Sequence, residues 1–434
     1  MSKKPAQDAP RSAKAEVEGA NRIVCDRNLD SPPPKYHWKH EMNNKVAERM
    51  GRLHNESAFQ ILARANELEA LGKNIVHLEI GQPDFKTPNN IIEAAYKAMK
   101  DGKTGYGPSP GIVPLREAIA QYCEDYKKVK TGIDEIVVTP GGKPVMFFAI
   151  LMLCQKGDEV IYPDPGFPIY ESVINFAGAK PIPMPLLDKN NFRVDLDRLK
   201  KDINEKTKLI IINNPCNPTG GMFSREDILA IAEMVREKDI YILSDEIYDR
   251  IFYGEQPLSI ASVSGMKDKT IILDGFSKSY AMTGWRLGYG IMNLELAEQM
   301  SLLMVNSASC AATITQWAAI EALKGPQDAV TEMTAAFKER RDYLVNALNQ
   351  IKGISCAMPG GAFYVFPNIS SFGLSSKEFA KGLLEEAGVA AAGGTSFGSY
   401  GEGFLRISYA NSLPNLKIAV ERIAGFCGTV ALQR

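Results

Sequence analysis

The sequence contains very little histidine, and all of it lies near the start of the chain. The four histidines, at positions 37, 40, 54 and 77, fall in the first fifth of the 434 residues. A histidine-based catalytic triad or a metal site with several histidine ligands is therefore excluded from the rest of the chain. A general base there must be a lysine, a carboxylate or a tyrosine.

The sequence also lacks paired cysteines and an excess of either charge. The seven cysteines are scattered and form no Cys-x-x-Cys pair, so neither a disulfide framework nor a zinc site is indicated. We expect no metal and a reducing, cytoplasmic compartment. The 50 Lys and Arg nearly balance the 51 Asp and Glu, which argues against nucleic acid as a partner and favours a small-molecule ligand.

No apolar run is long and clean enough to span a membrane. The longest uncharged stretch, residues 301–320, contains polar side chains such as Asn306 and Gln316 that lipid would leave unsatisfied. We therefore predict that this stretch is a buried helix of a soluble protein, with no membrane partner.

Residues 1–45 differ in composition from the rest of the chain. They are rich in Lys, Ala, Ser and Asp and then carry three consecutive prolines at 32–34. No apolar segment follows the basic start, so we do not expect a secretory signal. We predict an extension outside the main fold that is either flexible or in contact with a partner.

Apolar runs of strand length alternate with segments at helical spacing through the middle of the chain, as in a largely parallel sheet with crossover helices. The runs occupy residues 135–139, 159–162, 208–213, 240–244, 270–274 and 286–292. They predict one large α/β domain. A long amphipathic helix at 328–350 and short strands at 362–366 and 404–408 then indicate a second, smaller α+β unit.

The residues that follow the first two runs are candidates for ligand binding, because ligands of open α/β sheets lie at the carboxyl ends of strands. Gly142 and Lys143 follow the first run and precede a helix-like segment, whose N-terminal amides favour an anion such as phosphate. The same glycine turn could be purely structural. Phe167 follows the second run, where its ring could stack on a planar ligand or pack in the core.

Charged and amide side chains follow the later runs. Asn217 lies in a loop constrained by prolines and could bind a ligand or only shape a turn. Asp245 directly follows a buried run, and its carboxylate needs a cation that a protonated ring nitrogen would supply. Lys278 is costly at a strand end unless it is exposed, paired or covalently used. Arg286 could hold a phosphate and Arg406 a substrate carboxylate.

Several of these residues belong to motifs that occur in a fixed order. The motifs are Asn217-Pro-Thr-Gly, Ser244-Asp-Glu-Ile-Tyr, Ser277-Lys278, Gly284-Trp-Arg and Arg406. In this order and spacing, the chain resembles the class I/II aminotransferases of fold type I, which depend on pyridoxal 5′-phosphate (PLP). Gly81-Gln-Pro-Asp-Phe and Tyr106 resemble the bacterial and plant aspartate and prephenate aminotransferase subgroup more closely.

The resemblance implies an α/β fold of the type I PLP enzymes. We expect a large domain with a mostly parallel seven-stranded sheet flanked by helices, and a smaller α+β domain built from the N- and C-terminal segments. The expected boundaries are 81–324 for the large PLP-binding domain and 46–80 with 325–434 for the small domain, after the extension at 1–45. A homodimer with active sites at the subunit interface is also implied.

The resemblance further implies roles for the residues singled out above. Lys278 would carry PLP as a Schiff base and, once substrate displaces it, would move the α-proton. Asp245 would pair with the ring nitrogen, and Tyr248 would hydrogen-bond the ring oxygen. The remaining cofactor contacts would be Phe167 on the ring face, Asn217 at the ring oxygen, Gly142, Lys143, Ser277 and Arg286 at the phosphate, and Tyr106 from the other subunit.

The substrate end of the implied site is less well specified. The α-carboxylate would lie on Arg406, helped by the Gly81 amide and Asn217. In acid-specific members of the subgroup, a lysine at the Lys143 position and a small hydroxyl residue near the N-terminus read the distal carboxylate. Here the segment 57–59 is Ser-Ala-Phe, with a bulky ring near that hydroxyl. The amino acid and the oxo acid are therefore left open.

We predict a transaminase that moves the α-amino group of an L-amino acid to a 2-oxo acid. A PLP-dependent β-lyase, synthase or oxidase would need the same Lys278 and Asp245, so the sequence alone leaves this alternative open. A non-catalytic regulator on the same fold is disfavoured, because no DNA-binding motif precedes the domain and Lys278 is retained.

Overall fold

The computed structural model describes residues 46–54 and 56–432. The predicted extension at 1–45 lies outside the described residues. Ala47–Arg434 form one compact unit, so the expected boundaries between a large and a small domain remain a prediction. In the described part of the chain, no helix is long and apolar enough to cross a membrane.

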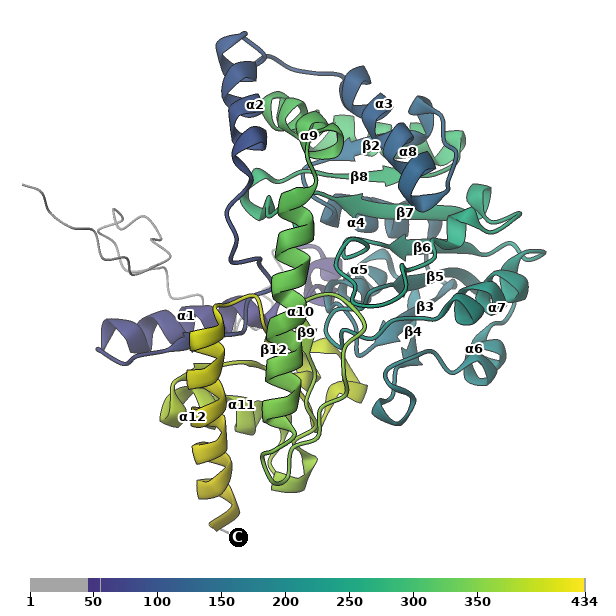
Figure 1. Ribbon diagram of the computed structural model, residues 1–434. Helices are drawn as coiled ribbons and strands as arrows, with labels where there is room; N and C mark the ends of the chain where they lie inside the picture. The colour runs from purple at the N-terminus through teal and green to yellow at the C-terminus, as the bar shows by residue number, and fades with distance from the viewer. Residues whose placement is uncertain (1–45, 55, 433–434) are drawn as a thin grey trace, which may run out of the picture. The chain divides into compact units, whose positions relative to one another are not determined.

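A seven-stranded sheet lies at the centre of the fold, with strand order β2-β8-β7-β6-β5-β3-β4 (Figure 1). The strands are β2 (Ile136–Thr139), β3 (Glu159–Asp164), β4 (Lys180–Pro185), β5 (Thr207–Asn213), β6 (Tyr241–Asp245), β7 (Thr270–Gly275) and β8 (Gly288–Ile291). Neighbouring strands are parallel except at β8, which runs antiparallel to both β2 and β7. The prediction of a mostly parallel seven-stranded α/β sheet is confirmed.

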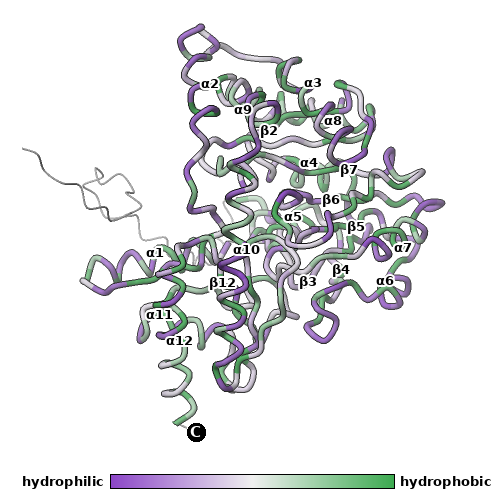
Figure 2. The backbone as a smooth tube through the Cα atoms, viewed as in Figure 1, coloured by the Kyte–Doolittle hydropathy of each residue, from purple (hydrophilic) through white to green (hydrophobic). Residues whose placement is uncertain are grey.

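The strands are apolar along their length because helices cover both faces of the sheet. Along β5, Leu209 and Ile211 face one hydrophobic cluster, whereas Ile210 and Ile212 face another. All four side chains are at most 1% exposed, as expected for a parallel sheet buried on both sides. Figure 2 shows the central strands as largely hydrophobic, whereas the outer helices alternate between hydrophobic and hydrophilic residues.

One strand of this sheet does not appear among the apolar runs. β4 has the sequence Lys-Pro-Ile-Pro-Met-Pro, and its three prolines have no N–H to donate to a neighbouring strand. The strand lies at the edge of the sheet and pairs only with β3. An edge strand tolerates prolines, because one side of it needs no ladder of hydrogen bonds.

The helices that flank the sheet divide between its two faces. Beside the strands of one face pack α4 (Lys143–Leu153), α5 (Ile169–Ala177) and α8 (Leu294–Ser307). The other face is covered by α2 (Asn89–Lys100), α3 (Val113–Tyr122) and α9 (Thr313–Lys324) around β2 and β8, and by α6 (Leu196–Asp202) and α7 (Arg225–Val235) around β5 and β6.

The expectation of one buried helix at 301–320 is wrong. The stretch contains the end of α8 and the start of α9, with a break between Ser307 and Thr313. Ser309 has φ +61° in this break, a left-handed conformation that an α-helix cannot continue. The stretch is also only partly buried, since Leu302 and Val305 in α8 are more than half exposed.

Another hydrophobic cluster, called the second cluster below, lies outside the central sheet. It combines a three-stranded antiparallel sheet of β9 (Tyr364–Val365), β11 (Ala392–Gly393) and β12 (Leu405–Ser408) with the parallel pair β1 (Val76–His77) and β10 (Val389–Ala390). Packed beside them are α10 (Asp328–Leu348), α11 (Ser376–Ala387) and α12 (Leu413–Leu432), with α1 (Ser57–Ala70) close to β10 and β11. The predicted long helix and both short strands are confirmed.

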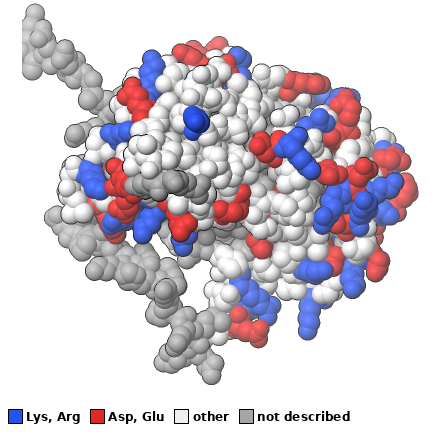
Figure 3. All heavy atoms as spheres, turned by 90° about the horizontal axis from the view of Figure 1, so that it is seen from below, with Lys and Arg blue, Asp and Glu red and all other residues white. Residues whose placement is uncertain are grey.

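The surface carries both signs of charge. On the face shown in Figure 3, Lys and Arg side chains lie interspersed with Asp and Glu side chains. Several of them form ion pairs within one helix, such as Arg198 with Asp202 at 2.7 Å. This arrangement fits the near-neutral balance of the whole sequence.

Replacing a buried side chain of the second cluster should lower the stability of the protein. Phe337 in α10 is fully buried against Phe85, Phe363 and Tyr409. We expect Phe337→Ala to lower the free energy of unfolding by about 3–5 kcal/mol, because it removes buried contacts and leaves a cavity. Urea denaturation followed by circular dichroism measures the change. Leu71→Ala, at a position 76% exposed, is the control, and an equal loss in both variants would contradict the prediction.

Candidate active site

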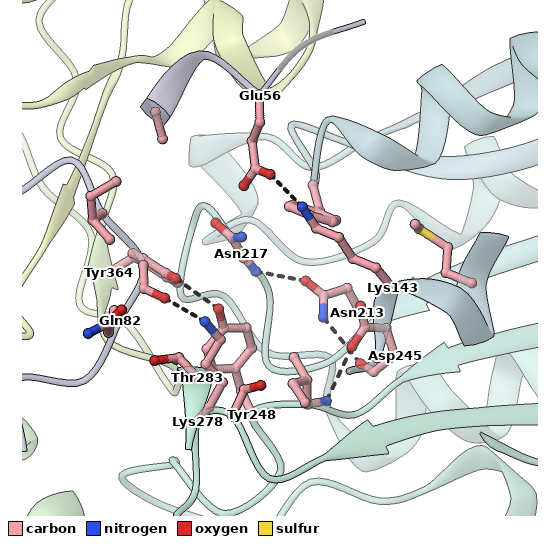
Figure 4. A pocket seen from close by; sticks show the side chains of 18 of the residues that line it. Glu56, Gln82, Lys143, Asn213, Asn217, Asp245, Tyr248, Lys278, Thr283 and Tyr364 are labelled. Carbon is pink, nitrogen blue, oxygen red and sulfur yellow. Dashed lines mark hydrogen bonds and ion pairs between the residues drawn. The ribbon is translucent and has the colours of Figure 1, made fainter. Parts of the chain in front are cut away.

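A pocket of about 630 Å³ lies where the carboxyl ends of the central strands meet the second cluster (Figure 4). Every predicted site residue except Tyr106 lines it. The lining residues among those predicted are Gly81, Gly142, Lys143, Phe167, Asn217, Asp245, Tyr248, Ser277, Lys278, Arg286 and Arg406. The side chain of Tyr106 is 95% exposed and lies outside this pocket.

The strand order explains how these distant positions come together. Phe167, Asn217 and Lys278 each follow the carboxyl end of a parallel strand, β3, β5 and β7 respectively. Arg286 instead precedes β8. Because β8 is antiparallel to its neighbours, its beginning lies at the same edge as their ends.

The start of α4 and Arg286 form a cradle suited to an anion. Gly141 has φ +90°, and a Cβ on it would lie 2.4 Å from Nη2 of Arg286. Only glycine therefore lets the guanidinium approach this backbone so closely. Gly142 is the N-cap of α4, so helix amides and a guanidinium converge on one place, the combination that proteins use to bind phosphate.

Asp245 ends β6 with its carboxylate almost fully buried. It accepts hydrogen bonds from the Tyr170 hydroxyl at 2.5 Å and the Ile247 amide at 3.2 Å. Burial raises the pKa of Asp245 to about 6, although these two donors favour the charged form. Among the described residues no ion pair involves Asp245, so the carboxylate is suited to a cationic ligand atom such as a protonated ring nitrogen.

Lys278 reaches across the pocket and donates a hydrogen bond to the Gly81 carbonyl (Figure 4). Burial, together with the positive charges of Arg406 and Arg286, lowers the pKa of Lys278 to about 8. A large fraction of this amine is therefore neutral near pH 8, and a neutral amine is the form that attacks carbonyl groups.

Arg406 in β12 is 4% exposed and has a free hydrogen-bond donor. Its Nη1 donates to Oδ1 of Asn217 at 3.2 Å, and its guanidinium lies over the rings of Tyr364 and Phe397 at 4.8 and 4.7 Å. Its Nε is buried without a partner among the described residues. A buried donor of this kind is costly unless a ligand such as a carboxylate occupies it.

Two residues that support the site, Tyr364 and Asn213, do not follow from the motifs. Tyr364 shares a hydrogen bond of 2.8 Å with the hydroxyl of Tyr248. Tyr364 also explains why residue 81 is a glycine, because a Cβ there would lie 2.1 Å from the Tyr364 hydroxyl. Asn213 accepts from the Asn217 amide at 2.8 Å and so fixes the loop that holds Asn217. Tyr364 lies in a predicted strand, but only the tertiary packing of β9 brings it here.

The third residue that sequence reasoning missed is Glu56, which precedes α1. Its carboxylate pairs with the Lys143 ammonium at 2.6 Å (Figure 4). In this part of the wall the pocket is lined by Glu56, Ala58 and Phe59, but not by Ser57. The hydroxyl considered for reading a distal carboxylate is therefore outside the lining.

A buried charge cluster lies beside the site but outside the pocket. The Lys127 ammonium pairs with Glu246 at 2.9 Å, with Asp274 at 3.1 Å and with Asp249. All four side chains are at most 6% exposed. Burial and the neighbouring carboxylates raise the pKa of Asp249, so this carboxyl takes up a proton more readily than an exposed aspartate does. Sequence reasoning did not identify Lys127.

Comparisons with known proteins agree with this geometry. The sequence model of the family "Aminotransferase class I and II" matches residues 73–423. The chain is similar to an aspartate aminotransferase of Bacillus subtilis, at 39% identity over 88% of this chain and 98% of the relative. It is also similar to an aromatic-amino-acid aminotransferase of Thermococcus litoralis, at 40% identity over 81% of this chain and 91% of the relative.

A solved structure is similar along its whole length. The aspartate aminotransferase of Thermus thermophilus with maleate superimposes with a TM-score of 0.85 at 35% identity. The match covers 89% of this chain and 100% of the solved one.

The charge cluster yields a prediction. Lys127→Met leaves three buried carboxylates without a cation, so we expect the free energy of unfolding to fall by about 3–5 kcal/mol. Adding Asp249→Asn and Asp274→Asn to the same chain should restore much of the loss, because two of those charges are then removed. Urea denaturation at pH 7.5 measures both changes.

The adjacent Lys128 provides the matched control for this experiment. Its ammonium is exposed and donates only to the Asp125 carbonyl at 2.6 Å. Lys128→Met should change stability by less than about 0.5 kcal/mol. If Lys127→Met were as harmless as the control, the cluster would have no stabilising role.

Proposed function

Since this chain belongs to the class I and II aminotransferase family, we propose that Lys278 and the pocket around it form its active site. The protein is an aminotransferase, which moves the α-amino group of an L-amino acid to a 2-oxo acid. A β-lyase, synthase or oxidase, which the motifs leave open, is not favoured, because the similar proteins are aminotransferases.

The observation that carries the proposal is the presence of a partly buried amine, a buried carboxylate and a buried guanidinium in one pocket. Asp245 ends β6, Lys278 follows the next strand, β7, and Arg406 comes from β12, which is distant from both in the sequence. Among the described residues, Lys278 and Asp245 form no ion pair, although both form hydrogen bonds, and Nε of Arg406 is buried without a hydrogen-bond partner. An amino acid and a cofactor with a basic ring nitrogen would supply the missing partners.

The family uses PLP as its cofactor, and the residues of this pocket fit that group. The cradle of Gly142, Ser277 and Arg286, together with the backbone amide of Lys143, suits the phosphate. Asp245 suits the ring nitrogen, because it is buried, has a pKa of about 6 and is largely ionised at pH 7. An ionised carboxylate there would keep a proton on that nitrogen.

The remaining cofactor contacts come from three side chains. Phe167 would pack on the ring face, and Asn217 and Tyr248 would hydrogen-bond the ring oxygen. The side chain of Tyr248 is fixed in position, because its hydroxyl shares a hydrogen bond with that of Tyr364 and its ring packs edge-on against Phe363. These roles rest on the position of each residue in the pocket wall.

When bound, PLP supplies an electron-withdrawing ring that makes the α-proton of an attached amino acid acidic. Lys278 would hold the cofactor covalently and, once released, would take this proton and return it. Its low pKa fits that task, because a base works best when its pKa lies near the working pH. Arg406 would orient the substrate by binding the α-carboxylate, with Asn217 and the Gly81 amide beside it.

We further propose a homodimer in a cytoplasmic compartment. Tyr106 lies outside the pocket of its own chain, so a contact with the phosphate would have to come from a partner subunit. Exposed apolar side chains on α2, among them Tyr96 and Met99, offer surface for such a partner. The six cysteines in the described part of the chain are all unpaired, in keeping with a reducing compartment.

A panel of acidic, aromatic, aliphatic and basic amino acids tests the reaction. With a good donor, we expect the visible absorbance of the PLP-bound enzyme to fall while one equivalent of the matching 2-oxo acid is released. Lys278→Ala should show neither the absorbance of covalently held PLP nor turnover. Release of ammonia with pyruvate, or of peroxide, would instead support lyase or oxidase chemistry.

The low pKa of Lys278 predicts how the cofactor-free enzyme takes up PLP. Only the neutral amine forms the covalent bond, so the rate should rise with pH around a midpoint of about 8, well below the ordinary lysine value of 10.5. Stopped-flow absorbance after mixing with PLP measures this rate. A midpoint near 10.5, or the same signal in Lys278→Ala, would show that Lys278 is not the reactive amine.

A further inference from the structure

The ion pair between Glu56 and Lys143 determines the charge that a substrate side chain meets. The charged side chains in the pocket lining are Glu56, Lys143, Asp245, Lys278, Arg286 and Arg406. The proposed function assigns a task to the last four: Asp245 and Arg286 to the cofactor, Lys278 to its attachment and Arg406 to the α-carboxylate. The side chains of Lys143 and Glu56 have no assigned task, and they form an ion pair at 2.6 Å that carries no net charge.

The surroundings of the pair are apolar. The Lys143 ammonium lies 5.3 Å from the centre of the Phe167 ring, a weakly favourable cation–π contact. Ala58, Phe59 and Met146 line the pocket as well. A side chain that enters this region therefore finds apolar walls and a neutral ion pair.

A substrate with a second carboxylate would meet an obstacle here. Its distal carboxylate would have to displace Glu56 from Lys143 or sit next to it, and two carboxylates at one ammonium repel each other. An uncharged side chain leaves the pair intact. Since the side chains of Glu56 and Lys143 are 23% and 48% exposed, the pair is partly screened by water and its effect is moderate.

We propose that Glu56 is a specificity-determining residue that occupies Lys143 and thereby favours L-amino acids with uncharged aromatic or aliphatic side chains over dicarboxylic ones. This inference rests on the proposed function, because it takes the α-carboxylate to lie on Arg406. It identifies the class of substrate that the sequence motifs leave open.

Binding of two unreactive acids to the PLP-loaded enzyme tests the proposal without turnover. Succinate carries a second carboxylate, whereas 3-phenylpropanoate carries a phenyl ring in the same region. Isothermal calorimetry gives the Kd of each for the unaltered enzyme and for Glu56→Gln. We expect Glu56→Gln to shift the ratio of the two Kd values in favour of succinate by about three- to tenfold, because the Lys143 ammonium is then free.

Two further variants separate this effect from a general change in the protein. Glu67→Gln removes a glutamate of α1 that pairs with Arg64 outside the pocket, and it should leave the ratio unchanged. In the double variant Glu56→Gln with Lys143→Met, the gain for succinate should disappear, because the gain depends on the ammonium. An unchanged ratio in Glu56→Gln, or a gain that survives the loss of Lys143, overturns the proposal.

The amino-donor panel distinguishes failure of this inference from failure of the proposed function. We expect kcat/KM for phenylalanine or leucine to exceed that for aspartate, and Glu56→Gln to narrow the difference. Preference for aspartate in the unaltered enzyme, or for a basic donor, overturns the role of Glu56 while leaving an aminotransferase. If no amino acid converts the PLP-bound enzyme, the proposed function itself is wrong.

Discussion

Burial of charge at the edge of a hydrophobic sheet is the constraint on which this site depends. Asp245 and Glu246 are adjacent at the end of β6, and both are removed from water. Asp245 lines the pocket, whereas Glu246 lies in the cluster around Lys127. Charges in such surroundings require partners. Lys127 supplies the cation for Glu246, whereas under the proposed function a bound ligand would supply the cation for Asp245.

The cluster around Lys127 connects the segments that carry Asp245, Tyr248 and Lys278, the proposed catalytic residues. Glu246 follows Asp245, Asp249 follows Tyr248, and Asp274 precedes Lys278 by a short loop. One ammonium holds all three carboxylates. The relative positions of β6, β7 and the loop between them therefore depend on a group that never touches the pocket.

Much of the fold and most of the pocket could be predicted from the sequence, because buried parallel strands are continuous apolar runs and ligands lie at their ends. Asp245 and Lys278 were found in this way. β4 was not predicted, because its prolines are tolerated only at the edge of a sheet and the sequence does not show that edge position. The break between two helices at Ser309, within residues 301–320, was not predicted either. Glu56 and Lys127 were not predicted for another reason. Each forms ion pairs with residues 87 or more positions away, and no local sequence pattern indicates such a pairing.

The antiparallel direction of β8 restricts where residues can be inserted into this chain. Lys278 and Arg286 both lie on the connection between β7 and β8, two antiparallel neighbours, so this short loop is anchored at both ends by functional groups. The connections β3–β4, β4–β5 and β5–β6 instead run through α5, α6 and α7 on the outside of the sheet, where added residues would lie away from the pocket. We therefore expect insertions to be accepted in those outer connections, whereas one added residue between Lys278 and Arg286 would separate the amine from the anion cradle.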